Sequence, residues 1–240
     1  MRSTVSKLVF DIETVGEDFD SLDKITQDVL TQWIQREAKD DKEYEHLFAD
    51  LRNGLGFSPL TGKIVAIGVL DVDKEKGGVY YQSPDKKQEK KEENGITYEA
   101  MDEEKILRKF WEIAVKYRMF ISFNGRGFDV PYMMARSAAN KVPPTKNLMK
   151  GRYLYQQDSD AMHIDLQDQL TFYGAMRKKG GLHLWSRAFG IKSPKSEGIT
   201  GDDVSRLFKE KNYLDIARYN ALDLFATSDL YKVWETYFNI

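Results

Sequence analysis

The sequence predicts an α/β fold in which a mixed central sheet is flanked by helices. Apolar, β-branched runs come first and give three or four strands, and strands then alternate with segments of helical spacing. No internal repeat and no linker-like stretch divides the 240 residues. We therefore expect a single domain over residues 1–240.

The first half of the chain is expected to supply most of the sheet. A buried strand is predicted at 7–12, followed by an acidic insertion at 17–60 in which Ile25, Val29 and Trp33 follow the spacing of a helix. Two helices are expected there. Further strands are predicted at 64–72 and 79–82. The charged segment 84–95 is expected to be a mobile hairpin tip with its returning strand at 96–98.

The second half is expected to alternate strands and helices. A helix is predicted at 103–117, a short buried strand at 119–123, and a helix at 128–140 with Pro131 tolerated in its first turn. A short strand is expected at 163–166. Helices are then predicted at 168–177, 182–189, 202–210 and 213–238.

Composition excludes several classes of site. The chain has no cysteine, so disulfides, thiolate metal sites and a cysteine nucleophile are excluded. No apolar run is long enough to span a bilayer, and Met1–Lys7 leaves no room for a signal peptide, so we expect a cytoplasmic protein without membrane contact. The net charge is −7 from Glu17 to Asp50 and +6 from Lys141 to Lys195. Solvated surface explains such charge runs, but the basic stretch would also suit a phosphate-bearing partner.

Two acids end the first strand. Asp11 and Glu13 are i and i+2, so their side chains project from the same face. Neighbouring carboxylates raise each other's pKa unless a cation lies between them, and Mg²⁺ or Mn²⁺ suits oxygen ligands. An acid pair ending a strand is also common without a metal.

A second candidate follows the strand at 119–123. Asn124 and two glycines form a turn, and Asp129 then lies at the start of a helix. An N-cap aspartate explains this position equally well. Glycine also lets a substrate approach the backbone closely, which makes Asn124 and its turn a candidate contact.

The third candidate lies in the last long helix. Tyr219 and Asp223 are i and i+4, so a phenol and a carboxylate share one helix face. A surface pair is the alternative. Acids on a first strand, after a later strand and on a last helix can meet at one edge of a sheet. Four carboxylates in one pocket would be costly without cations, and two divalent ions would neutralise them.

These segments resemble the DEDD group of 3′→5′ exonucleases, which have a ribonuclease H-like fold. The chain is most similar to the proofreading exonuclease domain of family B DNA polymerases and its stand-alone relatives. The resembling motifs are Phe10–Thr14, Asn124 with Phe128–Tyr132, and Tyr219–Asp223, and the resemblance spans about 8–240. A sister subclass carries histidine five residues before the final aspartate. Arg218 occupies that position here, so the tyrosine form fits.

The resemblance implies the chemistry. Asp11, Glu13, Asp129 and Asp223 would bind two divalent ions, Mg²⁺ or Mn²⁺, and Tyr219 would orient the attacking water. Single-stranded nucleic acid would be cut from its 3′ end to nucleoside 5′-monophosphates, with DNA favoured over RNA. Thr14, Asn124 and Phe128 are candidates to contact the terminal nucleotide, although Phe128 is equally consistent with core packing.

Three other functions remain open at this stage. The chain could be a nucleic-acid-binding module that does not cut, although acids facing phosphates argue against it. It could be a trans-acting subunit that docks on a polymerase or repair complex, with the acidic insertion as the partner surface. It could also be a metal-dependent phosphoesterase acting on small nucleotides.

Overall fold

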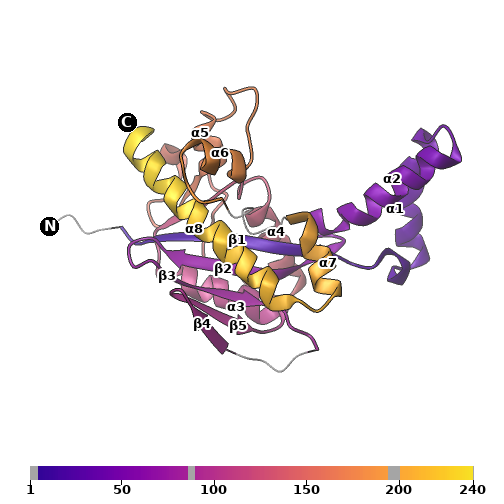
Figure 1. The fold of residues 1–240 in the computed structure, drawn as a ribbon, viewed down its shortest axis with the longest axis horizontal. Helices are drawn as coiled ribbons and strands as arrows, with labels where there is room; N and C mark the ends of the chain where they lie inside the picture. The colour runs from indigo at the N-terminus through magenta and orange to yellow at the C-terminus, as the bar shows by residue number, and fades with distance from the viewer. Residues whose placement is uncertain (1–4, 86–89, 194–200, 240) are drawn as a thin grey trace.

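The computed structural model describes residues 5–85, 90–193 and 201–239, and within them one mixed sheet forms the centre of the molecule (Figure 1). Its seven strands lie in the order β4-β5-β3-β2-β1-β6-β7. They are β1 (Lys7–Gly16), β2 (Gly62–Asp71), β3 (Lys76–Tyr81), β4 (Lys90–Glu93), β5 (Ile96–Ala100), β6 (Met119–Ser122) and β7 (Met162–Asp165). The central strand β1 is antiparallel to β2 and parallel to β6, which is in turn parallel to β7. The α/β prediction is confirmed.

Helices cover both faces of this sheet. Their bounds are α1 (Lys24–Glu37), α2 (Asp41–Gly54), α3 (Glu103–Ala114), α4 (Asp129–Ala139), α5 (Leu166–Leu170), α6 (Leu182–Ala188), α7 (Val204–Lys209) and α8 (Tyr213–Tyr237). Short 3₁₀ turns lie at Phe19–Ser21, Leu55–Phe57, Leu154–Gln156 and Gly201–Asp203. Among the described residues, no helix is both long enough and apolar enough to cross a membrane.

The alternation of side chains along β1 divides the core into two layers. Val9 belongs to the cluster that packs beneath α8, whereas Leu8 and Phe10 belong to the cluster beneath α3 and α4. Asp11 and Glu13 continue the series of Val9 and therefore face α8. The position of the acid pair thus follows from the buried apolar residues that precede it.

The acidic insertion forms a two-helix arm that projects from the body (Figure 1). Both predicted helices are present as α1 and α2, and Asp23 and Asp40 cap their N-termini. The base of the arm is closely packed, since a Cβ added to Gly16 would lie 2.7 Å from Leu55 Cβ. The arm is therefore anchored where β1 ends and β2 begins.

Hydroxyl groups from two distant segments hold this base. Thr14 Oγ1 donates to the carbonyl of Gly56 at 2.8 Å, and the Tyr132 hydroxyl donates to the same carbonyl at 3.1 Å. Because Gly56 ends the arm, both β1 and α4 fix where the arm leaves the body.

The predicted hairpin tip at 84–95 is wrong. Lys90–Glu93 form the edge strand β4, which pairs with β5 through a turn at Asn94 and Gly95, where φ is +50° and +79°. The strand at 96–98 is real, but β5 runs parallel to β3 and is not its antiparallel return. Charged side chains suit an exposed sheet edge, which explains why a charge-rich segment forms a strand. Residues 86–89 lie outside the described residues.

The helix predicted at 168–177 is also wrong over most of its length. Helix α5 ends at Leu170, because Phe172 and Tyr173 adopt left-handed backbone conformations with φ of +50° and +56°. The remaining predicted strands and helices are present, with shifted ends.

Candidate active site

The C-terminal half of β1 carries the acid pair beyond the end of its ladder with β6, while β2 pairs with its other side. The ladder with β6 comprises only Lys7–Val9. Farther along, the backbone N–H of Ile12 donates to Asp129 Oδ1 at 3.1 Å, so a carboxylate from α4 replaces the next strand residue. Phe128 is the N-cap of α4 and Asp129 is its first residue. Asp129 therefore bonds to β1 and is not the cap of its own helix.

Helix α8 brings the third acid. One carboxylate oxygen from each of Asp11, Glu13 and Asp223 lies within 4.8 Å of the others. Glu13 and Asp223 are each 8% exposed, and Tyr219 is also buried. Acids more than 200 positions apart in sequence thus meet above β1, as the sequence predicts.

The close approach of α8 depends on an asparagine and a glycine. Asn220 is fully buried, and its Nδ2 donates to Asp11 Oδ2 at 2.8 Å. Gly68 lies opposite Asp11 in the β1–β2 register. A Cβ at Gly68 would lie 2.0 Å from Asn220 Oδ1, so only glycine leaves room for this amide.

Burial and mutual repulsion disfavour the charged forms of Asp11, Glu13 and Asp129. Withdrawal from water raises the pKa of Asp11 well above its usual range, and Asp129, Asp223 and Glu13 raise it further. Burial likewise raises the pKa of Glu13, with Asp223 adding to the effect. The pKa of Asp129 is raised to about 7, again mainly by burial. Enclosed oxygen ligands that repel one another in this way are suited to a hard divalent cation.

Tyr219 retains its proton at neutral pH. Burial raises the pKa of its phenol far above the ordinary value, and the charge of Asp223 raises it further. A hydrogen bond joins Tyr219 to Asp223 and also favours the protonated phenol. The hydroxyl is therefore a hydrogen-bond donor beside Asp223. We call Asp11, Glu13, Asp129 and Asp223 the acid cluster.

Comparison with known proteins supplies the family. A family model described as "predicted 3′-5′ exonuclease related to the exonuclease domain of PolB" matches residues 58–237. The chain belongs to this family. The matched region contains Asp129, Tyr219 and Asp223, whereas Asp11 and Glu13 precede it.

Two relatives of this member of the PolB-related exonuclease family are DNA polymerases. DNA polymerase 1 of Sulfolobus acidocaldarius is 23% identical over 172 residues, and that of Sulfurisphaera ohwakuensis is 20% identical over 171. Each match includes 65% of this chain and 19% of the polymerase, so the chain spans about a fifth of their length. The family B DNA polymerase of Pyrobaculum calidifontis has the same fold, with a TM-score of 0.57 and 18% identity over 96% of this chain and 24% of that one.

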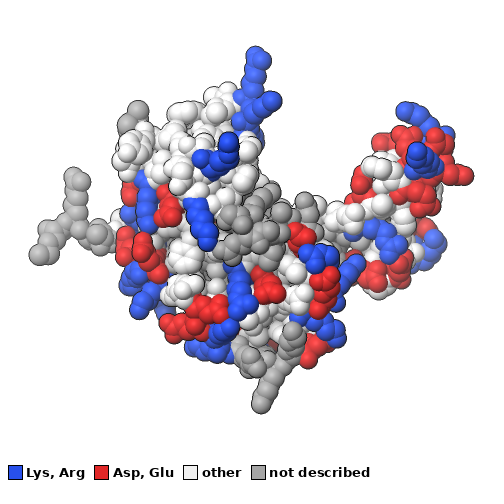
Figure 2. Space-filling model, viewed as in Figure 1, with Lys and Arg blue, Asp and Glu red and all other residues white. Residues whose placement is uncertain are grey.

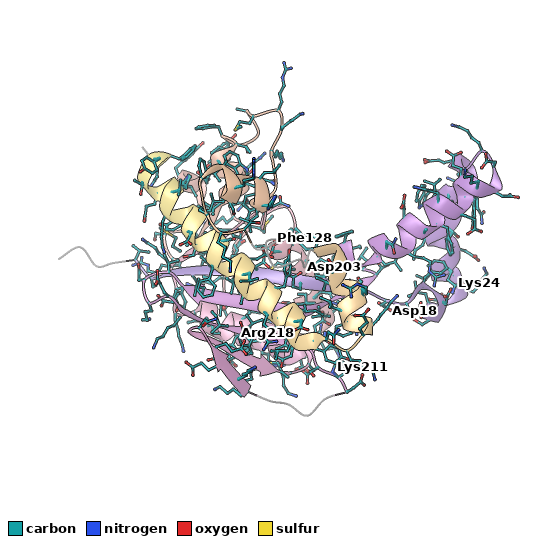
Figure 3. All side chains as sticks on the ribbon, viewed as in Figure 1. Asp18, Lys24, Phe128, Asp203, Lys211 and Arg218 are labelled. Atoms are coloured by element: carbon teal, nitrogen blue, oxygen red, sulfur yellow. The ribbon has the colours of Figure 1, made fainter. Side chains whose placement is uncertain are left out.

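The three residues predicted to contact the terminal nucleotide, Thr14, Asn124 and Phe128, differ in their surroundings. Asn124 is half-buried and has a left-handed backbone with φ of +62°. Phe128, labelled in Figure 3, is half-buried and its ring packs against Tyr132 at 5.4 Å between centroids. The hydroxyl of Thr14 already donates to Gly56. A role in substrate contact for these three residues stays a prediction.

Asp165 organises the turn that precedes Asp129. Its carboxylate accepts from the backbone N–H groups of Asn124 and Arg126, both at 2.9 Å. Neighbouring His163 is fully enclosed, and burial lowers its pKa to about 3. Its ring contacts Ser122 Oγ at 2.7 Å and the Leu148 carbonyl at 3.1 Å, so it is a neutral structural residue.

Sequence analysis did not identify roles for Asn220, Gly68 or Asp165. Asn220 lies directly beside Tyr219, so its place in the third motif was an available signal. Gly68 is one of several glycines in the chain, and nothing in its neighbourhood marks it. Their roles depend on which strand and helix meet in space.

Proposed function

We propose that the chain is a metal-dependent 3′→5′ exonuclease that hydrolyses phosphodiester bonds at the 3′ end of single-stranded nucleic acid. Nucleoside 5′-monophosphates would be the products. The meeting of Asp11, Glu13 and Asp223 within 4.8 Å, in a family described as exonucleases, carries this proposal. The relatives from Sulfolobus acidocaldarius and Sulfurisphaera ohwakuensis are DNA polymerases, which favours DNA over RNA as the substrate. The chain would act in trans, and its protein partner would be a polymerase or a repair protein.

The donor set fits two divalent ions, Mg²⁺ or Mn²⁺. Asp11, Glu13 and Asp223 would hold one ion, and Asp129 together with Asp11 would hold the other. All four donors are carboxylates, which hard cations prefer, and the raised pKa values of Asp11, Glu13 and Asp129 reflect the charge that cations would neutralise. Such ions supply positive charge that activates a water molecule and stabilises the leaving oxygen.

The remaining polar groups position the acids. The Asn220 amide fixes one oxygen of Asp11, and the Ile12 N–H fixes one oxygen of Asp129. Each carboxylate is thereby oriented before substrate arrives, which reduces the reorganisation required during reaction. Protonated Tyr219 would orient the attacking water through its hydroxyl. Thr14, Asn124 and Phe128 would contact the 3′-terminal nucleotide.

The test is shortening of a 5′-labelled single-stranded DNA with Mg²⁺ or Mn²⁺. Asp223→Asn keeps the shape of the side chain but removes its charge, and we expect it to abolish shortening. Asp229→Asn, on the exposed side of the same helix, is the matched control and should retain activity. Full activity in Asp223→Asn would reject the proposal.

Two further outcomes would identify the other functions. Binding of the strand without shortening, with or without a chelator, would indicate a binding module. Cleavage of a mononucleotide ester without processing of strands would indicate a small-molecule phosphoesterase. RNA and duplex DNA of the same sequence complete the substrate panel.

A further inference from the structure

Three tyrosines form an aromatic surface near the turn that precedes Asp129. The Tyr153 and Tyr155 rings are stacked, with centroids 5.8 Å apart and planes at 10°. The Tyr173 ring meets Tyr153 edge-on at 4.6 Å. Tyr155 is 84% exposed, so one face of the stack has no packing role in the described part of the chain. We call Tyr153, Tyr155 and Tyr173 the tyrosine ledge.

An unfavourable backbone conformation holds one member of the ledge in place. Phe172 and Tyr173 are consecutive residues with positive φ, which residues with a Cβ seldom adopt. The turn is closed by the Tyr173 N–H, which donates to the Asp168 carbonyl at 2.6 Å. Such conformations persist where the surrounding structure enforces them, and they concentrate at functional sites.

The ledge lies close to the turn that precedes Asp129, because Arg126 of that turn interacts electrostatically with Tyr173. The Arg126 guanidinium donates to the carbonyls of Leu148 and Met149 at 3.1 and 3.0 Å. Arg152, next to Tyr153, donates twice to Asp168, at 2.7 and 3.2 Å. The ledge therefore lies close to this turn, and Asp129 at the end of the turn interacts electrostatically with Asp11.

Charge distinguishes the two sides from which a strand could approach. The arm belongs to the acidic stretch from Glu17 to Asp50, with net charge −7, and would repel phosphates. The ledge lies in the basic stretch 141–195, net +6, and the exposed cations Arg177, Lys178 and Lys179 follow it closely. Figure 2 shows basic side chains projecting from the lobe that carries α5 and α6. Within the described ranges, no carboxylate lies within 4 Å of these three cations.

We propose that the tyrosine ledge is a stacking site for a base of the single-stranded substrate, upstream of the nucleotide being removed. This inference rests on the proposed function for the direction of the strand. Aromatic faces next to cations bind single strands without sequence preference, because every base has a face that can stack. The nearby lysines and Arg177 would contact the phosphates of the same strand.

The test measures binding, which does not require cleavage. Fluorescence anisotropy with labelled oligothymidylate gives the Kd in the Asp223→Asn background. We expect Tyr155→Ala to raise the Kd about fivefold or more, which is the lower end for loss of one stacked base. Tyr155→Phe should bind like the parent, because the ring remains. Tyr237→Ala, at the end of α8 and 72% exposed, is the matched control and should have no effect.

Photocrosslinking locates the contact. A strand with 5-iodouracil at an internal position should crosslink to a peptide containing Tyr153, Tyr155 or Tyr173. The stacking proposal would be rejected by an unchanged Kd in Tyr155→Ala. It would also be rejected if Tyr155→Ala and Tyr155→Phe weakened binding equally. If the wild-type chain shortens strands while Tyr155→Ala binds normally, only the ledge fails. If Tyr155 governs binding but the wild-type chain does not shorten strands, the ledge stands and the proposed function fails.

Discussion

The substitution Gly68→Ala tests how closely helix and sheet must approach at the acid cluster. The added Cβ would lie 2.0 Å from Asn220 Oδ1 and 2.7 Å from Leu224 Cδ1, whereas real contacts begin at 3.0 Å. Asn220 and Leu224 are both fully buried, so neither side chain can turn into solvent. Relief of the Oδ1 contact alone, from 2.0 to 3.0 Å, requires a displacement of about 1 Å.

Two losses follow from that displacement. Overpacking of a filled core costs about 1–3 kcal/mol of unfolding free energy. The Asn220 amide also moves away from Asp11 Oδ2, which it contacts at 2.8 Å. A misplacement of about 1 Å in an active site can reduce the rate on the order of 100-fold. We therefore expect a modest loss of stability together with a much larger loss of nuclease activity.

The assays are urea denaturation and the shortening of labelled single-stranded DNA. Gly54→Ala is the matched control, because a Cβ there meets no described atom within 4 Å beyond its chain neighbours and the backbone of its own helix. In the double variant Gly68→Ala/Asn220→Ala, the shorter of the two contacts is relieved and the contact with Leu224 remains, so stability should recover in part while activity stays low. Wild-type stability and wild-type activity in Gly68→Ala would refute the reasoning.

Two further predictions concern the acids and the phenol. Tyr219→Phe removes a hydroxyl that keeps its proton, so we expect slower DNA shortening with little change in Mg²⁺ affinity by titration calorimetry; a lost Mg²⁺ affinity would contradict the orienting role. The folded chain holds a proton on Asp129 up to about pH 7, whereas an unfolded aspartate titrates near its ordinary pKa of 3.8. The metal-free folded chain therefore binds the proton more tightly, and its stability should fall as the pH rises from about 4 to about 7 and remain low above that. Urea denaturation in chelator should show this fall and Mg²⁺ should reduce it; stability that rises over this range would contradict the assignment.

The sequence was sufficient for the features that depend on local periodicity. Alternation along β1 placed Asp11 and Glu13 on one face, and helical spacing placed Tyr219 and Asp223 together. The meeting of these segments was predicted correctly because parallel strands and a covering helix converge at one edge of the sheet. In the structure, carboxylate oxygens of Asp11, Glu13 and Asp223 lie within 4.8 Å of one another.

Features that depend on tertiary contacts were missed. Nothing in the local sequence ends α5 at Leu170, because neither glycine nor proline follows immediately, and the reversal at Phe172 and Tyr173 depends on surrounding contacts. The edge strand β4 escaped prediction because its residues are all charged. The pairing of Asn220 with Gly68 could not be inferred from either residue alone.

The shared carbonyl of Gly56 affects how motif residues are interpreted in other chains. Thr14 and Tyr132 lie in motif segments that resemble those of polymerase proofreading domains. Both hydroxyls nevertheless donate to Gly56, where the two-helix arm ends. A hydroxyl at these two positions is therefore explained by that attachment and is not by itself evidence of a catalytic role. In chains that lack the two-helix arm, these two positions need no hydroxyl to bond to it. The loss of either hydroxyl in such a chain is therefore not by itself a sign of lost activity.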